Sequence, residues 1–188
     1  MADSTTAVTP DAPKGRKIRV PGLGTFDTLN PYVLKGIPAS ESIGVFGITE
    51  MNEPLMVGTG WYLESGDEPQ SAYCLICAHL EYPDDFSWVI FQINPKARFH
   101  NGDPITAADV ANSFDLLIGE DANPLYRNVY GNVKSAEVLS PQRVKFSFRE
   151  PGGRSMILRL GELPVMSKKH WDTHPFAASP GVPPPLSG

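Results

Sequence analysis

Residues 97–114 read Ala-Arg-Phe-His-Asn-Gly-Asp-Pro-Ile-Thr-Ala-Ala-Asp-Val-Ala-Asn-Ser-Phe, a turn followed by the start of a helix. Asn101-Gly102 is a turn dipeptide, because both residues tolerate a positive φ. Thr106 has the N-cap position, and Asp109, three residues later, comes close to the spacing of a capping box. This stretch therefore predicts a well-defined helix N-terminus.

The helix is predicted to run to about Ile118 and to end at Gly119. Its large apolar side chains recur at i, i+4 and i+7, a spacing that places them on one face. They are Val110, Phe114 and Leu117. We therefore expect this face to pack against the rest of the domain.

Short elements precede this helix. Residues 17–20 predict a first strand, and residues 41–50 predict helix turns. Residues 87–93 alternate in hydrophobicity, as the residues of a half-buried strand do. A Gly-punctuated loop leaves the first strand.

A hairpin is predicted after the helix. Residues 133–139 and 143–149 flank Ser140-Pro141-Gln142, and one face of the hairpin is apolar while the other is polar. Residues 156–163 form a last amphipathic segment. The buried face of the second strand carries Val144, Phe146 and Phe148. The whole pattern predicts an α/β class, that is, mixed α and β with short strands and few helices.

Prolines divide the chain into short elements. The 188 residues include 19 prolines, most of them spread between Pro10 and Pro164. This spread excludes a helical bundle, a coiled coil or a solenoid, which need long periodic stretches. We expect residues 1–16 to be a flexible lead-in and residues 17–174 to form one domain. Residues 175–188 are rich in proline and can be neither helix nor central strand.

Charge argues against nucleic-acid binding, and hydropathy argues against a transmembrane helix. The net charge is −5 and the pI is about 5.3, whereas a nucleic-acid-binding domain is normally basic. No stretch is long and apolar enough for a transmembrane helix. The first residues have no basic segment followed by an apolar one, so we expect no signal peptide within this chain.

Two cysteines and two histidines imitate the spacing of a zinc site. Cys74 and Cys77 form one pair and His170 and His174 the other, but about ninety residues separate the pairs, against about twelve to fifteen in Cys₂His₂ sites. A small zinc-binding protein is therefore the alternative function. The simpler interpretation is small buried thiols in the apolar run 73–78. A disulfide between Cys74 and Cys77 is the alternative in an oxidising compartment, but its geometry is awkward if the segment is regular.

No catalytic residue is expected. His100 lies beside Asn-Gly, yet no nucleophile or partner is placed by spacing for it to act on. The chain also lacks a G-x-S-x-G motif. We interpret the His100 segment as a structural turn and predict that the protein is not an enzyme.

The stretch 97–114 resembles a signature of the family 5 extracellular solute-binding proteins, the peptide, nickel and oligosaccharide receptors of ABC importers. The family form reads approximately A-R/K-F-H-D-G-x-P-V-T-A-E-D-V-x-x-S-F, and here Asn101 replaces the usual Asp. Residues 9–15 and 24–36 resemble the start of the microcin C and long-peptide receptor branch. Further motifs follow in order, so the resemblance covers about residues 9–188.

The resemblance implies a type II fold like that of periplasmic binding proteins, of which residues 17–174 form an incomplete N-terminal lobe. It implies capture of a peptide, of oligopeptide or peptide–nucleotide type, in the periplasm and delivery to ABC transporter permease subunits. It implies no cofactor, no nucleic acid, contact with the membrane only through the permease, and a monomer. Residues 175–188 are expected to be a truncated crossing to a second lobe, and the chain alone is expected to bind peptide poorly.

The resemblance also directs two segments towards the ligand. The first contains Thr25, Phe26, Asp27 and Asn30, where Asp27 could meet an N-terminal amine. The second contains Tyr126 and Tyr130, whose rings and hydroxyls suit tolerant binding of peptides. The alternatives are a turn with Phe26 in the core and two partly buried tyrosines. No metal ligand is assigned.

Overall fold

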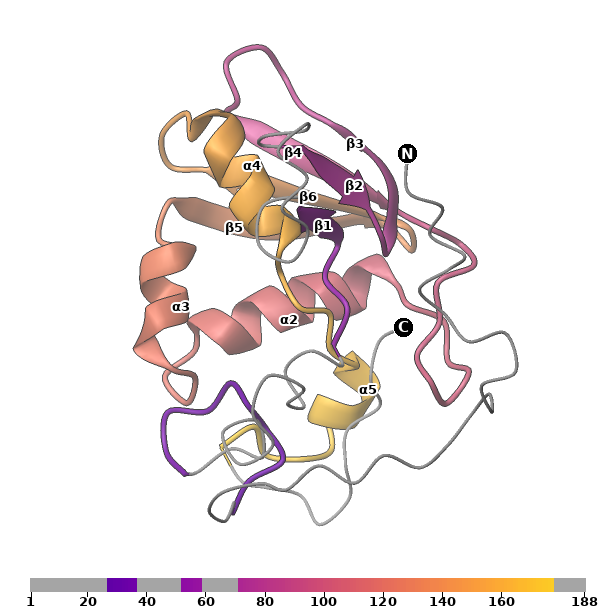
Figure 1. The fold of residues 1–188 in the computed structure, drawn as a ribbon, viewed down its shortest axis with the longest axis vertical. Helices are drawn as coiled ribbons and strands as arrows, with labels where there is room; N and C mark the ends of the chain where they lie inside the picture. The colour runs from indigo at the N-terminus through magenta and orange to yellow at the C-terminus, as the bar shows by residue number, and fades with distance from the viewer. Residues whose placement is uncertain (1–26, 37–51, 59–70, 178–188) are drawn as a thin grey trace, which may run out of the picture.

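The structure is a computed structural model that describes residues 27–36, 52–58 and 71–177. The predicted strand at 17–20 and helix turns at 41–50 lie outside these residues. The elements are β1 (Met56–Gly58), β2 (Ala72–Cys74), β3 (Cys77–Glu81), β4 (Trp88–Ile93), α2 (Ala107–Ile118), α3 (Pro124–Val129), β5 (Val133–Ser140), β6 (Arg143–Phe148), α4 (Gly153–Gly161) and α5 (Lys168–Trp171) (Figure 1). The mixed α and β composition is thereby confirmed.

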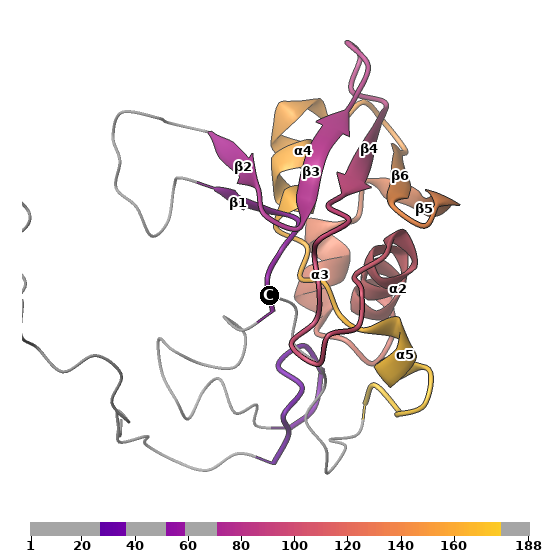
Figure 2. The same cartoon turned by 90° about the vertical axis from the view of Figure 1, so that its right-hand side faces the viewer.

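Four strands form one antiparallel sheet in the order β3-β4-β6-β5, and β1 and β2 pair as a separate ribbon. In the sheet, Val89 lies opposite Phe146, and Phe91 lies opposite Val144. These four side chains therefore point to the same face, and all are buried. Figure 2 shows the β1–β2 ribbon projecting away from the sheet.

The helices cover this apolar face. Phe114 of α2 meets Phe146 edge-on with ring centroids 5.6 Å apart, and Phe91 meets Phe146 at 6.1 Å. The predicted face of α2 is buried throughout, and α4 adds Met156, Ile157 and Leu160. Burial of these side chains is the main favourable term in the stability of such a domain. The predicted bounds of α2, of the β4 strand and of the β5–β6 hairpin are confirmed.

The N-terminus of α2 is held by one carboxylate. The backbone N–H of Thr106 donates to Asp109 Oδ2 at 2.9 Å, and the Thr106 hydroxyl donates to the same oxygen at 2.6 Å. Asp109 Oδ1 accepts from the backbone N–H of Lys168 at 2.9 Å, so the cap also holds the start of α5. A buried carboxylate needs such partners to offset its lost hydration.

The turn before α2 is structural, as the sequence indicates. Gly102 has φ +87°, a backbone conformation that residues other than glycine rarely adopt. Its N–H donates to the Phe99 carbonyl at 2.8 Å. The Asn101 side chain accepts from the Asp103 N–H at 3.1 Å. None of the helices in the described residues is long and apolar enough to cross a membrane.

Candidate ligand-binding face

Three tyrosines meet on one side of the molecule and line a hollow of about 540 Å³. Tyr126 and Tyr130 come from α3 and its end, and Tyr32 comes from the segment 27–36. The full lining is Tyr32, Asn52, Glu53, Pro54, Leu75, Tyr126, Val129, Tyr130, Arg159, Glu162 and Pro164. The hollow therefore collects side chains from segments far apart in the chain.

The short helix α3 sets the spacing of two of these rings. Its N-cap, Asn123, accepts from the Leu125 N–H at 3.0 Å, and Pro124 opens the first turn. Tyr126 and Tyr130 are four residues apart, which places them on one helix face. Their rings are nearly parallel, with centroids 6.5 Å apart.

Backbone pairing between the segments around Tyr32 and Asn123 positions the third ring. The Asn123 N–H donates to the Tyr32 carbonyl at 2.9 Å, and Val33 forms a bridge with Ala122. As a result the Tyr32 ring meets the Tyr126 ring edge-on at 5.9 Å. The three rings form one contiguous aromatic cluster, in which Tyr32 and Tyr130 are 4% exposed and Tyr126 is half-buried.

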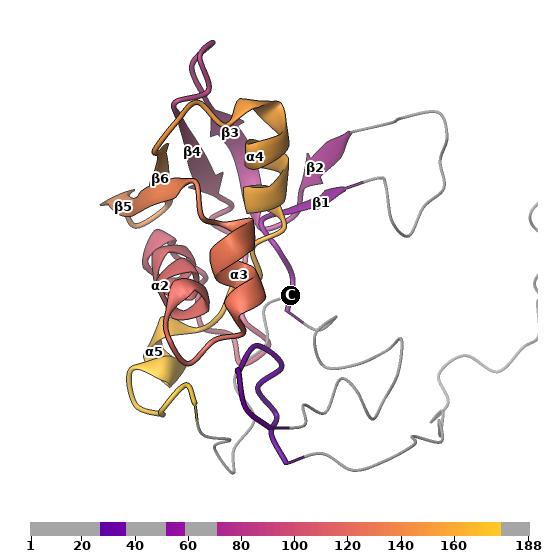
Figure 3. The same cartoon turned by 90° about the vertical axis from the view of Figure 1, so that its left-hand side faces the viewer.

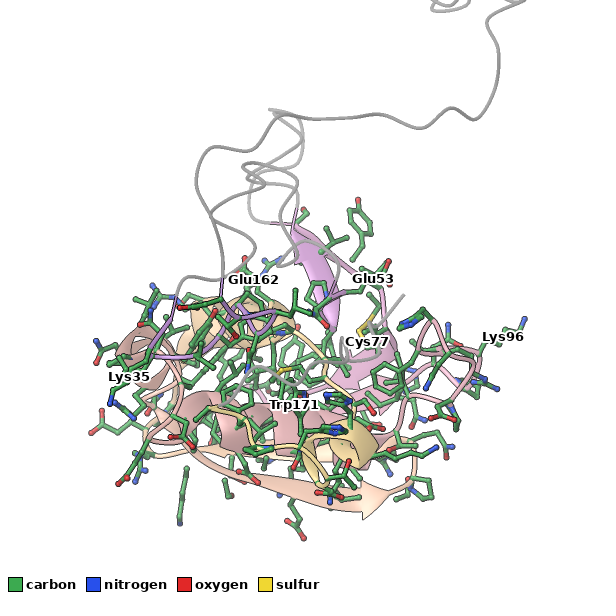
Figure 4. All side chains as sticks on the ribbon, turned by 90° about the horizontal axis from the view of Figure 1, so that it is seen from below. Lys35, Glu53, Cys77, Lys96, Glu162 and Trp171 are labelled. Carbon is green, nitrogen blue, oxygen red and sulfur yellow. A yellow bond between two sulfur atoms is a disulfide. The ribbon has the colours of Figure 1, made fainter. Side chains whose placement is uncertain are left out.

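Two carboxylates border this surface. The Val165 N–H donates to the Glu53 carbonyl at 3.2 Å, and Pro54 pairs with Pro164. This pairing brings the residue 52–54 segment beside the end of α4, where Glu162 is the C-cap. Figure 4 shows Glu53 and Glu162 along the same edge of the molecule.

Two tyrosine hydroxyls of the hollow, which are already protonated at neutral pH, have pKa values raised above the ordinary one. Desolvation raises the pKa of Tyr130, and the nearby Tyr126 and Glu162 raise it further. Desolvation also raises the pKa of Tyr126. The hydroxyls are therefore neutral donors and acceptors at physiological pH. Among the described residues of the lining, Glu53 and Glu162 outnumber the one cation, Arg159, so the hollow favours a ligand that presents an apolar surface and a positive charge.

Of the predicted residues of the first loop, Asp27 and Asn30 do not line this hollow. Thr25 and Phe26 lie outside the described residues. Asp27 is exposed, and its carboxylate lies close to Gly36. Asn30 is 1% exposed, and its Nδ2 donates to the Phe176 carbonyl at 2.9 Å while its Oδ1 accepts from the Tyr32 N–H at 3.0 Å. Its side chain thus shapes the loop that delivers Tyr32.

Sequence reasoning missed Tyr32, Glu53, Arg159 and Glu162. Tyr32 lies inside the motif at residues 24–36, so its aromatic ring beside a turn was a usable signal. The two glutamates carry no local signal, because only the long-range pairing of Pro54 with Pro164 brings them to the same hollow.

The interpretation of the cysteines as thiols was wrong, because Cys74 and Cys77 form a disulfide. The expected difficulty does not arise. Cys74 ends β2 and Cys77 begins β3, so the two residues between them leave the regular strands and the Cα atoms approach to 4.9 Å. The bonded sulfurs are not free thiolate ligands for zinc. Within residues 27–36, 52–58 and 71–177, no three His, Cys, Asp or Glu side chains cluster to hold a metal.

More than half of the chain matches one family of known proteins. Residues 60–184 match the family described as bacterial extracellular solute-binding proteins, family 5 Middle. The Escherichia coli K12 protein YejA is 38% identical over 181 residues, which are 96% of this chain and 28% of YejA. The protein YepA of Agrobacterium fabrum, named a peptidoglycan-binding protein, is 33% identical over 170 residues, 90% of this chain and 27% of YepA.

A solved structure shows the same fold. The oligopeptide-binding protein AppA of Bacillus subtilis, in complex with a nonapeptide, matches 84% of this chain and 28% of AppA with a TM-score of 0.58 and 18% identity. The predicted fold, part of a type II periplasmic binding protein, is therefore confirmed. The chain spans less than a third of the length of these proteins.

Proposed function

The chain belongs to the family 5 bacterial extracellular solute-binding proteins, and we propose that its tyrosine-lined hollow is part of the wall on which such a receptor captures a peptide. Proteins of this family bind substrates without transforming them, work with ABC transporters and are periplasmic. The observation that carries the proposal is that three tyrosine rings and two carboxylates line one hollow.

The chemistry of the hollow suits a peptide better than a sugar or a metal complex. Aromatic faces accept many side chains with little selectivity, and neutral hydroxyls bond to peptide N–H and C=O groups alike. Glu53 and Glu162 attract a protonated amine, such as a peptide N-terminus or a lysine. In this proposal Tyr126 and Tyr130 contact the ligand as predicted, and Thr25, Phe26, Asp27 and Asn30 stay predicted site residues.

We further propose the finer points of the function. The receptor captures the peptide in the periplasm as a monomer, performs no chemistry on it and passes it to the permease subunits of an importer. The ligand is an oligopeptide. A peptide–nucleotide ligand of the microcin C type and, because YepA is named for peptidoglycan, a peptidoglycan stem peptide are the variants to compare. Hinge closure of two lobes is the mechanism that the family fold provides.

The proposal is tested by NMR titration of the ¹⁵N-labelled chain with a tetrapeptide, its N-acetylated form and a neutral oligosaccharide. Leu75, Arg159 and Glu162 at the rim are exposed, so much of a ligand seated on this face stays in water. We therefore expect a dissociation constant on the order of 1 mM. Peaks of Tyr126, Val129 and Tyr130 shift with the free tetrapeptide, and less with the acetylated one.

Tyr126→Ala is expected to abolish these shifts. Tyr82→Ala is the matched control, because Tyr82 is an exposed tyrosine outside the hollow. Equal shifts with the oligosaccharide, or shifts confined to residues outside the hollow, would contradict the proposal.

A further inference from the structure

The Cys74–Cys77 disulfide joins two separate sheets at the hollow. Cys74 is the last residue of β2 in the projecting ribbon, and Cys77 is the first residue of β3 at the edge of the four-stranded sheet. Figure 3 shows the β1–β2 ribbon leaving the body beside β3 and α4. The disulfide therefore spans the junction between the ribbon and the body of the domain.

The bridged turn is also held by backbone hydrogen bonds. The carbonyl of Leu55 accepts from the N–H groups of Leu75 at 3.0 Å and Cys77 at 3.2 Å. The Asn94 N–H donates to the Ile76 carbonyl at 2.9 Å. Ile76 and Cys77 are 2% exposed, whereas Leu75 is 40% exposed. The turn thus anchors Ile76 in the core and presents Leu75 outward.

Leu75 lies at the boundary between two hollows. It lines the tyrosine hollow and a second hollow of about 210 Å³, and Glu53 lines both as well. The second hollow continues along Asn94, Arg98 and Ile105. A chain-like ligand that occupies both hollows has to cross Leu75. The position of this side chain therefore decides how the ligand passes from one hollow to the other.

We propose that the Cys74–Cys77 disulfide is a redox-controlled latch that holds Leu75 at the boundary between the two hollows. The ligand side of this inference rests on the proposed peptide binding. A dithiol reductant opens the latch: it supplies two electrons and two protons, the S–S bond breaks, two thiols form, and the reductant closes to its own disulfide. The turn then keeps its backbone hydrogen bonds and the buried Ile76 side chain but loses its covalent closure, so the ribbon moves and an extended ligand loses its contact with Leu75.

The first test measures the latch without any ligand. Hydrogen exchange of the Leu75 and Cys77 amides is followed by NMR in the oxidised chain and after reduction with dithiothreitol. We expect exchange to accelerate by about tenfold or more at these two amides, because the S–S bond no longer restrains local opening of the turn. The Phe91 and Val144 amides in the sheet are the internal controls and keep their rates.

The second test measures the ligand. The tetrapeptide titration is repeated with an octapeptide long enough to cross Leu75. Reduction and the Cys74→Ser/Cys77→Ser variant each weaken octapeptide binding by about fivefold, the size expected for one lost side-chain contact. They weaken tetrapeptide binding less, because the tetrapeptide meets Leu75 only at the rim of the tyrosine hollow. Leu75→Ala gives the same loss with the disulfide intact. Leu139→Ala is the control, because Leu139 is equally exposed at 42% and lines neither hollow.

The outcomes separate the latch from the proposed function. Unchanged amide exchange on reduction overturns the latch, whatever the peptides do. Equal weakening of the short and the long peptide overturns the role of Leu75 as the boundary. Faster exchange at Leu75 and Cys77 without binding of either peptide supports the latch and contradicts the proposed function instead.

Discussion

Two regions of this domain are built in opposite ways. In the segment at residues 97–119, the turn and the helix N-terminus are formed by partners that are near neighbours in sequence, such as Thr106 with Asp109 and Asn101 with Asp103. The second region, the wall of the tyrosine-lined hollow, brings together Tyr32, the 52–54 segment, Leu75, α3 and the end of α4. The first region follows local rules of helix capping and turns, whereas the second exists only once the tertiary fold has formed.

The wall depends on Leu55, so Leu55→Ala is expected to have the largest effect. This side chain is 0% exposed, and its backbone carbonyl holds the disulfide turn. Truncation leaves a cavity and costs about 3 kcal/mol of unfolding free energy, measured by urea denaturation. Leu125→Ala is the control, because Leu125 is 60% exposed. A loss below about 1 kcal/mol would mean that the wall does not depend on this buried contact.

The cap depends on Asp109, and Asp109→Asn is expected to have an intermediate effect. An amide has one acceptor oxygen in place of two, so the change removes either the bonds from Thr106 or the bond from Lys168 and weakens what remains. We expect a loss of about 1.5 kcal/mol. Asp115→Asn is the matched control, because it removes the same charge from the same helix at an exposed position. Equal losses in the two variants would assign the effect to charge rather than to capping.

The elements that follow local rules are the ones that the sequence alone predicts. The bounds of α2 follow from Thr106 and Gly119, and the β5–β6 hairpin follows from alternating hydrophobicity, because both signals lie within one element. The family resemblance directs attention to Tyr126 and Tyr130, and the structure places both in one hollow.

The remaining wall residues could not be found this way. Glu53 and Glu162 are more than a hundred positions apart, and no period or spacing relates them. The sequence also left the pairing of Cys74 and Cys77 open between buried thiols and a disulfide that is awkward if the segment is regular. The segment is not regular, because the chain changes sheets between the two cysteines. Sheet membership is a tertiary property, which short-range hydrophobicity does not encode.

The smallest expected effect comes from a contact that joins a local turn to a distant helix. The pKa of the Asp103 carboxyl is held below its ordinary value first by the hydrogen bond from Lys169 of α5 and then by that from Asn101 of its own turn. Because the folded-state pKa is lowered, the contribution to stability is present above the unfolded-state pKa of 3.8 and is lost as the pH falls through the folded-state value. The group is exposed, so this contribution is screened by solvent and salt.

Lys169→Met is therefore expected to raise the pKa of Asp103 towards 3.8, and Asn101→Ala to raise it less. Carboxyl ¹³C shifts followed by NMR from pH 6 to pH 2 measure both variants. The order of the two effects is the informative result, because Asn101 acts from two residues away and Lys169 from sixty-six. If Asn101→Ala has the larger effect, the turn sets its own electrostatics, and the contrast between a locally built region and a region built by tertiary contacts extends to its charges. If Lys169→Met has the larger effect, as we expect, the pKa of a carboxyl in the most local part of this domain is set first by a helix that only the tertiary fold brings near.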